Sequence, residues 1–109
     1  MIRVLIIDDD PARVPRITKH AQLIAGARTL HVMHQACVPR DLSGYDLVYL
    51  DHDLGEETTY EQLKRAPAGA LRGKHVIIHS MNPVGARNLQ AAIEDAASVT
   101  IVPLSSMAP

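Results

Sequence analysis

The sequence predicts an α/β protein built on a five-stranded parallel sheet. Short apolar runs alternate along the chain with segments whose apolar residues recur at helical spacing. This alternation is typical of strands joined by crossover helices, which makes neighbouring strands parallel. The 109 residues are 47% hydrophobic, enough for the core of one domain covering residues 1–109. Three of the runs end directly in acidic or histidine residues, so we expect a polar site at one edge of the sheet.

Composition argues against several classes of function. A formal net charge of −1 gives no basis for binding a nucleic-acid duplex or an anionic membrane. The chain has three Tyr and no Phe or Trp, so it lacks the aromatic rings on which single-stranded bases stack. Cys37 is the only cysteine, and no stretch has the form of a signal peptide or a membrane span. We therefore expect a soluble cytoplasmic protein whose oligomeric state the sequence leaves open.

The first third of the chain predicts two strands around one helix. Residues 3–7 and residues 29–34 are the two strands. Asp10 followed by Pro11 has the form of an N-cap and first helical position, whereas Pro15 indicates a later start or an irregular first turn. The helix itself is indicated by apolar residues at helical spacing and a terminal glycine: Val14, Ile17, Ala21, Ile24 and Gly26.

The middle of the chain predicts a strand between two short helices. Proline and glycine leave room only for a brief helix over residues 39–42, and residues 46–50 form the third strand. Thr58 and Glu61 have capping-box spacing, as do Thr59 and Gln62 one residue later. A helix that begins there should end by residue 66, before a loop that contains two glycines.

The last third predicts two strands, one helix and a frayed tail. Residues 75–79 and 98–102 are the strands, and residues 103–109 form a flexible tail. Asn82-Pro83 opens the helix between them, with an inward stripe of Ala86, Leu89, Ile93 and Ala96. Right-handed crossovers then favour the flavodoxin-like strand order 2-1-3-4-5 with helices on both faces. In that order the first, third and fourth strands are adjacent, and their carboxyl ends meet at the ligand-binding edge.

Carboxylates gather at two of these strand ends. Asp8 and Asp9 follow the first strand, and Asp51 follows the third. Such charges repel one another unless a cation lies between them, and hard oxygen ligands suit Mg²⁺, Mn²⁺ or Ca²⁺. We therefore predict a divalent-metal site, for Mg²⁺ or Mn²⁺ above all, formed by these three residues. Asp53 can join the site or orient a neighbour, and Asp10 is read as the cap of the first helix.

Two histidines stand at the same edge. His52 follows the third strand and His79 ends the fourth, so each can serve as a general acid or base near neutral pH or bind a metal. A lone histidine at a strand end is more often structural, but a pair beside carboxylates favours a chemical role. The remaining histidines lack such neighbours and are read as surface or core: His20, His31, His34 and His75.

Residues 80–87 form a candidate phosphate-binding segment. A helix that begins at Pro83 directs free backbone N–H groups and the positive end of its dipole toward the crevice. Ser80 precedes this helix, and Arg87 lies one turn into it, where a guanidinium can form paired hydrogen bonds with a phosphate. Ordinary capping by Asn82 and a solvated Arg87 are the alternative interpretation. We take Ser80, Asn82 and Arg87 as candidate ligands of a substrate phosphate.

The arrangement resembles the receiver domains of two-component response regulators over nearly the whole chain. Asp8 with Asp9, Asp51 and Ser80 take the positions of the receiver's metal ligands, phosphoacceptor and switch hydroxyl. Receivers also carry a lysine after the fifth strand, whereas no lysine follows Lys74 here. Ordinary receivers lack the two histidines as well. These departures argue against signalling through an acyl phosphate.

Two segments resemble a particular receiver-derived family, the cyclic-phosphate processing receiver domains. They read LDHDLG and IHSMNPVGARNL, and the family is proposed to act on cyclic phosphates or nucleotides. The resemblance implies a receiver-like fold and the following functional positions: Asp8, Asp9, Asp51, His52, Asp53, His79, Ser80, Asn82 and Arg87. It adds weight to the phosphate-binding interpretation of residues 80–87 and names a class of substrate.

The first functional hypothesis is a metal-assisted phosphoesterase that processes a cyclic phosphate or cyclic nucleotide. His52, oriented by Asp53, would act as base and His79 as acid, and the two assignments can be exchanged. A second hypothesis is a non-catalytic receiver-like regulator or sensor that binds a phosphorylated small molecule. A third is an aspartate-nucleophile phosphatase that uses Asp8 and Asp10, although the chain lacks the later lysine and acidic pair of such a site.

Overall fold

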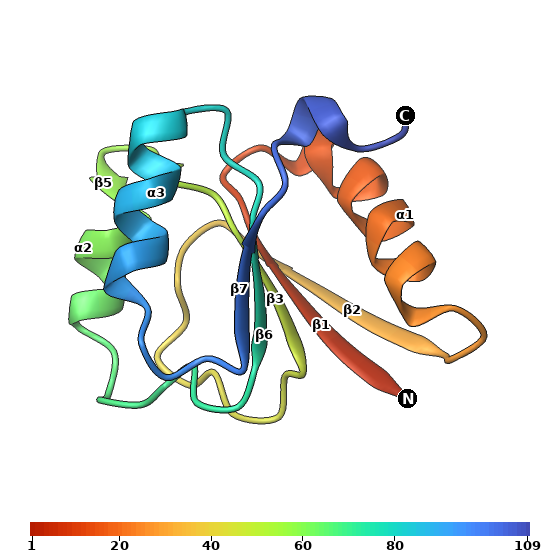
Figure 1. Ribbon diagram of the computed structural model, residues 1–109, viewed down its shortest axis with the longest axis horizontal. Coiled ribbons are helices and arrows are strands. Elements are labelled where there is room, and N and C mark those ends of the chain that lie inside the picture. Colours follow the sequence, from red (N-terminus) through yellow and green to blue (C-terminus); the bar gives the residue numbers. More distant parts are fainter.

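A computed structural model describes residues 1–109 and contains a central five-stranded parallel sheet (Figure 1). The strand order is β2-β1-β3-β6-β7, which confirms the order 2-1-3-4-5 expected from the sequence. The strands span Leu30–Gln35 (β2), Ile2–Ile7 (β1), Leu47–Leu50 (β3), His75–Ile78 (β6) and Ser98–Ile101 (β7). All four pairings between them are parallel.

Helices cover both faces of the sheet. α1 (Val14–Ala25) packs on one face, and α2 (Thr59–Lys64) and α3 (Pro83–Ala92) pack on the other (Figure 1). Side chains of β1 alternate between the two layers because successive residues of a strand point to opposite faces. Leu5 and Ile7 join the core under α2 and α3, whereas Val4 and Ile6 join the core under α1. None of the helices has the length and apolar character that crossing a bilayer requires.

The start of α1 explains the awkward Pro15. A 3-10 turn, η1 (Pro11–Arg13), precedes the helix, so Pro15 lies in the first turn of α1, where a missing N–H costs nothing. The side chain of Asp10 accepts a hydrogen bond from the backbone N–H of Ala12, as a cap should. The predicted irregular first turn is therefore present, and Asp10 has the capping role expected of it.

The segment between β2 and β3 differs from the prediction. Residues 39–42 form no helix, although Leu42 is buried in the core beneath α2 and α3. Pro39 and Gly44 leave only about one helical turn between them, too little to offset the cost of starting a helix. The prediction of a brief second helix there is wrong.

Two short strands after β3 were not expected. β4 (Asp53–Leu54) and β5 (Glu57–Thr58) form an antiparallel pair separate from the main sheet. Gly55 in the turn between them has a φ of 70°, which glycine adopts at little cost. The predicted capping box follows at once: the Thr58 side chain accepts from the Glu61 backbone, and the Glu61 side chain accepts from the Thr58 backbone.

The two ends of the last third also differ from expectation. α3 stops at Ala92, so Ile93 and Ala96 pack against the core from beyond the helix. After β7, the chain forms a 3-10 turn, η2 (Leu104–Ser106), and buries Met107 to 4% exposure in the core under α1. The last seven residues thus cover one end of that core, in contrast to the frayed tail that their sequence suggests.

Candidate active site

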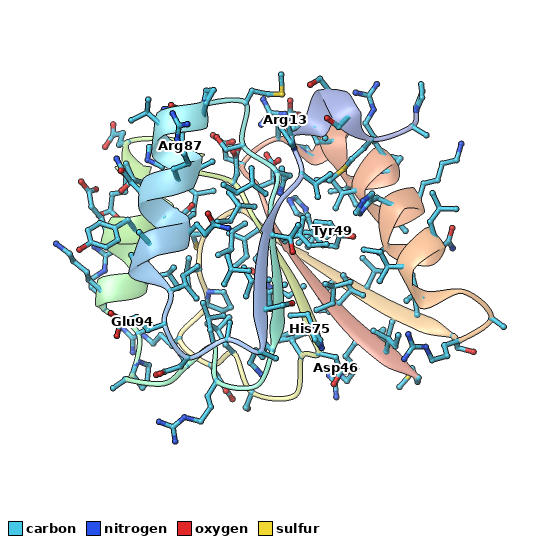
Figure 2. All side chains as sticks on the ribbon, viewed as in Figure 1. Arg13, Asp46, Tyr49, His75, Arg87 and Glu94 are labelled. Atoms are coloured by element: carbon cyan, nitrogen blue, oxygen red, sulfur yellow. The ribbon has the colours of Figure 1, made fainter.

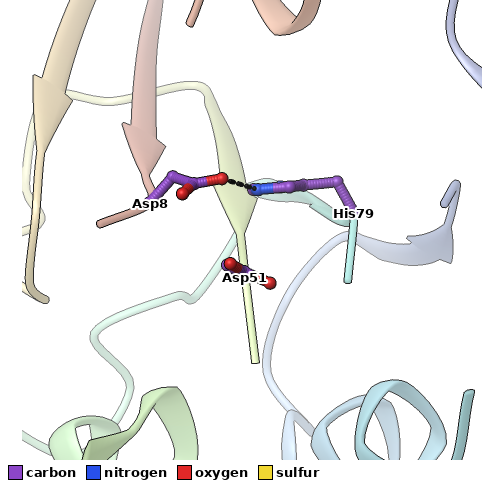
Figure 3. Close-up of side chains that lie close together, drawn as sticks. All are labelled: Asp8, Asp51 and His79. Carbon is purple, nitrogen blue, oxygen red and sulfur yellow. Dashed lines mark hydrogen bonds and ion pairs between the residues drawn. The ribbon is translucent and has the colours of Figure 1, made fainter. Parts of the chain in front are cut away.

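The register of the sheet brings the carboxyl ends of its three central strands level. Ile7 pairs with Leu50, and Leu50 pairs with Ile78. The ladder continues one residue further, because the backbone N–H of Asp51 donates to Ile7 O and that of His79 donates to Leu50 O. Asp8, Asp51 and His79 are thereby fixed side by side at one edge of the sheet, and all three are buried (Figure 3).

The Asp8–His79 pair is the most buried contact of this cluster. His79 Nε2 lies 2.8 Å from Asp8 Oδ2, and Asp8 Oδ1 accepts from the Asp10 backbone N–H at 2.8 Å. Burial raises the pKa of Asp8, but the hydrogen bonds of His79 and Asp10 and the nearby positive charges more than offset it. The net pKa is lowered, so Asp8 is a carboxylate and Nε2 carries the proton that it accepts. His79 Nδ1 is buried with no hydrogen-bond partner.

Arg13 bridges the two buried carboxylates, a role that the sequence pattern did not reveal. Its Nη1 lies 3.0 Å from Asp51 Oδ2 and 3.3 Å from Asp8 Oδ1. Burial lowers the pKa of Arg13, but the charges of Asp8 and Asp51 outweigh this and raise it. Burial and the neighbouring Asp8 raise the pKa of Asp51 despite this contact. The carboxylates alone predict a cation at this place, and the guanidinium of Arg13 supplies part of that positive charge.

Asp9 lies apart from the cluster. Its side chain is exposed, and Oδ2 accepts a hydrogen bond from the backbone N–H of Gly55 at 3.1 Å. Adjacent residues at a strand end point in opposite directions, so Asp8 and Asp9 cannot both face Asp51 in the same way. The group of potential ligands that the structure brings together is therefore Asp8, Asp51 and His79, with His79 in the place expected for Asp9.

His52 forms a second carboxylate–imidazole pair at the rim. His52 Nδ1 lies 3.0 Å from Asp53 Oδ1, so the two side chains for which the sequence predicts a partnership are in contact. The imidazole, 17% exposed, lies against the first turn of α3 at Gly85. A Cβ on Gly85 would lie 2.7 Å from two ring atoms of His52, closer than real Cβ contacts come. Glycine at this position is what allows the ring to rest on the helix.

The residues of the phosphate-binding segment divide between two neighbouring cavities. Asn82 Oδ1 accepts from the Gly85 N–H and caps α3, and Ser80 Oγ accepts from the N–H of Asn82 itself. Ser80 and Asn82 line the cavity beside Asp51 and His79, whereas Arg87 lines the adjoining one, which shares only Ser80 and Met81 with it. Figure 2 shows Arg87 on α3, well separated from Arg13.

The cavity beside the cluster is polar and open to solvent. It has a volume of about 410 Å³, room for a small phosphorylated molecule, and apart from Gly55 and the apolar Met81 and Leu104 its lining side chains are charged or polar. The lining residues are Asp9, Arg13, Asp51, Asp53, Gly55, His79, Ser80, Met81, Asn82 and Leu104. His52 is not among them, so only its partner Asp53 reaches this cavity.

A divalent cation fits the chemistry of the cluster. Asp8, Asp51 and His79 can each offer one ligand atom, and these atoms lie within 4.8 Å of one another. Two carboxylates suit Mg²⁺ or Mn²⁺, since both cations prefer oxygen ligands. The raised pKa of Asp51 and the unpartnered His79 Nδ1 also show that the cluster is not fully compensated by its own residues. Asp8 and Asp51 are the residues that would hold the cation.

Comparison with known proteins gives the family and the fold. The sequence model of the cyclic-phosphate processing receiver domain matches residues 3–95. The crystal structure of a CheY-like response regulator receiver domain protein from Methanospirillum hungatei JF-1 superimposes with a TM-score of 0.58 at 22% identity, over 94% of this chain and 82% of that one. No curated protein matches the chain. The structural match agrees with the receiver-like sheet, and the family model, which covers residues 3–95, shows that the chain belongs to the cyclic-phosphate processing receiver domain family.

Proposed function

We propose that the protein is a metal-assisted phosphoesterase that opens a small cyclic phosphate, such as a cyclic nucleotide. The observation that carries the proposal is the buried Asp8–His79 pair, which lies beside Asp51 at the wall of a polar cavity. Carboxylate-held imidazoles and acidic metal ligands are the groups that phosphoryl hydrolysis uses. The family name supports a cyclic phosphate as the class of substrate.

His79 is the proposed proton acceptor. Because Nε2–H donates to Asp8, the neutral ring carries its lone pair on Nδ1, which has no other partner. Water forms a new P–O bond and loses one proton to Nδ1, while the bond from phosphorus to one ring oxygen breaks. The leaving oxygen needs a proton, and His52, oriented by Asp53, is the proposed source. Because His52 does not line the cavity, it would donate through a bridging water beside Asp53, which does. The product is a phosphomonoester with a free hydroxyl.

The remaining residues are proposed to bind the phosphoryl group. Ser80 Oγ accepts from the Asn82 N–H, so its own O–H hydrogen can donate to a phosphoryl oxygen at the N-terminus of α3. Arg87, in the adjoining cavity, would contact the part of the substrate that extends beyond Met81. A Mg²⁺ or Mn²⁺ held by Asp8 and Asp51 would supply charge stabilisation on the phosphoryl oxygens.

The direct test is turnover of a substrate panel in the presence of Mg²⁺ or Mn²⁺. The panel contains 3′,5′-cyclic mononucleotides, cyclic dinucleotides and 2′,3′-cyclic phosphates, with formation of the phosphomonoester followed by ³¹P NMR. We expect hydrolysis of at least one class, lost in His79→Ala and retained in His75→Ala, whose exposed side chain lies at the opposite end of β6. Absence of hydrolysis across the panel would contradict the proposal.

A non-catalytic phosphate sensor is the second candidate. The observation that favours it is the contact of Arg13 with both carboxylates, which lets the cluster persist without a metal. In a sensor, the phosphorylated ligand binds the cavity and leaves unchanged. Tight binding of a panel member, measured by calorimetry, with no hydrolysis on any timescale of the assay would favour this candidate over the enzyme.

A further inference from the structure

Arg13 occupies the place between the two carboxylates where a divalent cation would bind. Its Nη1 approaches Asp51 Oδ2 at 3.0 Å and Asp8 Oδ1 at 3.3 Å. Mg²⁺ binds oxygen at roughly 2.1 Å, so an ion shared by these same two oxygens would occupy the space between them that Nη1 approaches. Two cations cannot share that position. Arg13 and a bridging metal therefore exclude one another.

Arg13 is the only basic residue that can compete in this way. No other Lys or Arg forms an ion pair with Asp8 or Asp51. Lys74, the last lysine of the chain, donates instead to Tyr45 O at the opposite end of the sheet. The positive charge at this edge comes from η1, at the start of the first helix, and from no residue after β7. Arg13 is thus the one Lys or Arg side chain that neutralises the cluster.

The local structure both holds Arg13 in place and gives it somewhere to go. Asp10 caps η1, and its second oxygen, Oδ2, lies 3.6 Å from Arg13 Nε, so the backbone and the base of the guanidinium are anchored at one point. The side chain is nevertheless 38% exposed and lines the polar cavity. Rotation of the outer guanidinium about this anchor would turn Nη1 from the carboxylates toward the cavity.

We propose that Arg13 is a built-in counter-cation which a divalent metal displaces, and that the displaced guanidinium then becomes the phosphate-binding group of the cavity. In the metal-free protein Arg13 occupies the cation site between the carboxylates. The same contact keeps its guanidinium from binding an anion in the cavity. Metal binding opens the anion site by freeing Arg13. The inference rests on the proposed function only for the identity of the anion as a phosphoryl group.

If Arg13 has this role, its removal should change the affinity for metal and the affinity for phosphate in opposite directions. Removing the Arg13 charge removes the competitor, so the metal should bind more tightly than in wild type when no anion is present. It also removes the freed guanidinium, so phosphate should bind the metal-loaded protein more weakly. In wild type, metal and phosphate should each strengthen the binding of the other by the same factor, as linkage requires. A residue with a merely structural role would weaken both ligands together.

Titrations followed by ¹⁵N NMR test this with Mg²⁺ alone, inorganic phosphate alone, and phosphate in the presence of Mg²⁺. Arg13→Gln should bind Mg²⁺ about five-fold or more tightly than wild type and bind phosphate about five-fold or more weakly when Mg²⁺ is present. Arg16→Gln, a charge change on the neighbouring helix turn with no ion pair, should match wild type. In wild type, the Arg13 side-chain resonances should shift on addition of Mg²⁺ and shift again with phosphate.

A second variant protects the test against loss of folding in Arg13→Gln. Asp10→Asn retains the Arg13 charge but weakens its anchor, so it should also tighten Mg²⁺ binding while retaining phosphate binding. Unchanged or weaker Mg²⁺ binding in both variants overturns the proposal, as does phosphate binding to wild type that is indifferent to Mg²⁺. These readouts do not depend on turnover. Failure of hydrolysis with the expected shifts intact would contradict the proposed function and leave this inference standing.

Discussion

His79 Nε2 donates to Asp8 Oδ2 across 2.8 Å, and the two side chains are 1% and 0% exposed. Solvent cannot compete for this hydrogen bond, so the imidazole has a fixed orientation and a fixed tautomer. The same burial leaves Nδ1 without a partner, which costs free energy in the folded protein. A buried, oriented imidazole with one unpartnered nitrogen, on a residue that lines the polar cavity, is the arrangement expected of a proton-transfer group.

His79→Gln should separate that role from packing. Glutamine can still offer a side-chain N–H to Asp8 but has no basic nitrogen, so we expect turnover on a reactive panel member to fall by on the order of 10²-fold. The fold and the rise in melting temperature caused by Mg²⁺ should be retained. His75→Gln, at the start of the strand that His79 follows, is the control and should keep wild-type turnover. Full activity of His79→Gln would remove this residue from the mechanism.

Asp51→Asn should stabilise the metal-free protein. Burial and the nearby Asp8 raise the pKa of Asp51 above its ordinary value of 3.8, so folding favours the protonated form. Stability contributed by this proton is present at low pH and is lost as pH rises toward and past the raised pKa. Asn carries no such cost, and we expect a melting temperature several degrees higher near pH 7 without metal, together with loss of the Mg²⁺-induced rise.

The pH dependence provides the matched control for that substitution. The lowered pKa of Asp8 means that its carboxylate contributes stability above pH 3.8, which is lost as pH falls through the folded-state pKa. Asp8→Asn should therefore destabilise the protein near pH 7, opposite in sign to Asp51→Asn. Both differences should shrink toward pH 3 in thermal melts across pH. Destabilisation by both substitutions at neutral pH would mean that the Arg13 contact outweighs the burial of Asp51.

Gly85→Ala should displace His52 without changing its chemistry. The added Cβ would come within 2.7 Å of the imidazole, whereas alanine itself favours a helix over glycine by about 1 kcal/mol. We expect a folded protein whose turnover falls as far as that of His52→Ala. Val84→Ala, at an exposed neighbouring position of α3, should leave activity unchanged. Wild-type turnover in Gly85→Ala would show that the contact of His52 with α3 has no part in the chemistry.

Met107→Ala should test the packed carboxyl-terminal segment. The side chain is 4% exposed among core residues such as Ile17 and Tyr49, so its loss should cost about 2 kcal/mol or more in urea unfolding. Met81→Ala, 59% exposed, should change stability by less than about 0.5 kcal/mol. If both substitutions had equally small effects on stability, residues 103–109 would be a flexible tail, as the sequence predicts.

The strand ends could be predicted because the signal is local. Apolar runs such as residues 3–7 and 75–79 can be satisfied only by a sheet buried on both faces, and right-handed crossovers leave few strand orders. Once the order is known, the residues that follow the central strands must meet. The sequence alone therefore indicates that Asp8, Asp51 and His79 are neighbours, and it also indicates the Asp10 cap and the Thr58 capping box.

Side-chain direction and long-range packing were decided only by the tertiary structure. Asp9 turns away from Asp51 to meet Gly55, and Arg13 reaches across from a short 3-10 turn, because each depends on where a distant backbone lies. Met107 is buried because it packs into the core under α1, and no pattern in the sequence of residues 103–109 predicts that contact. The hydrophobic pattern and the strand order determine which backbone positions lie close together. Which long side chain neutralises a buried charge depends on the positions of all its possible partners, and only the tertiary structure fixes these.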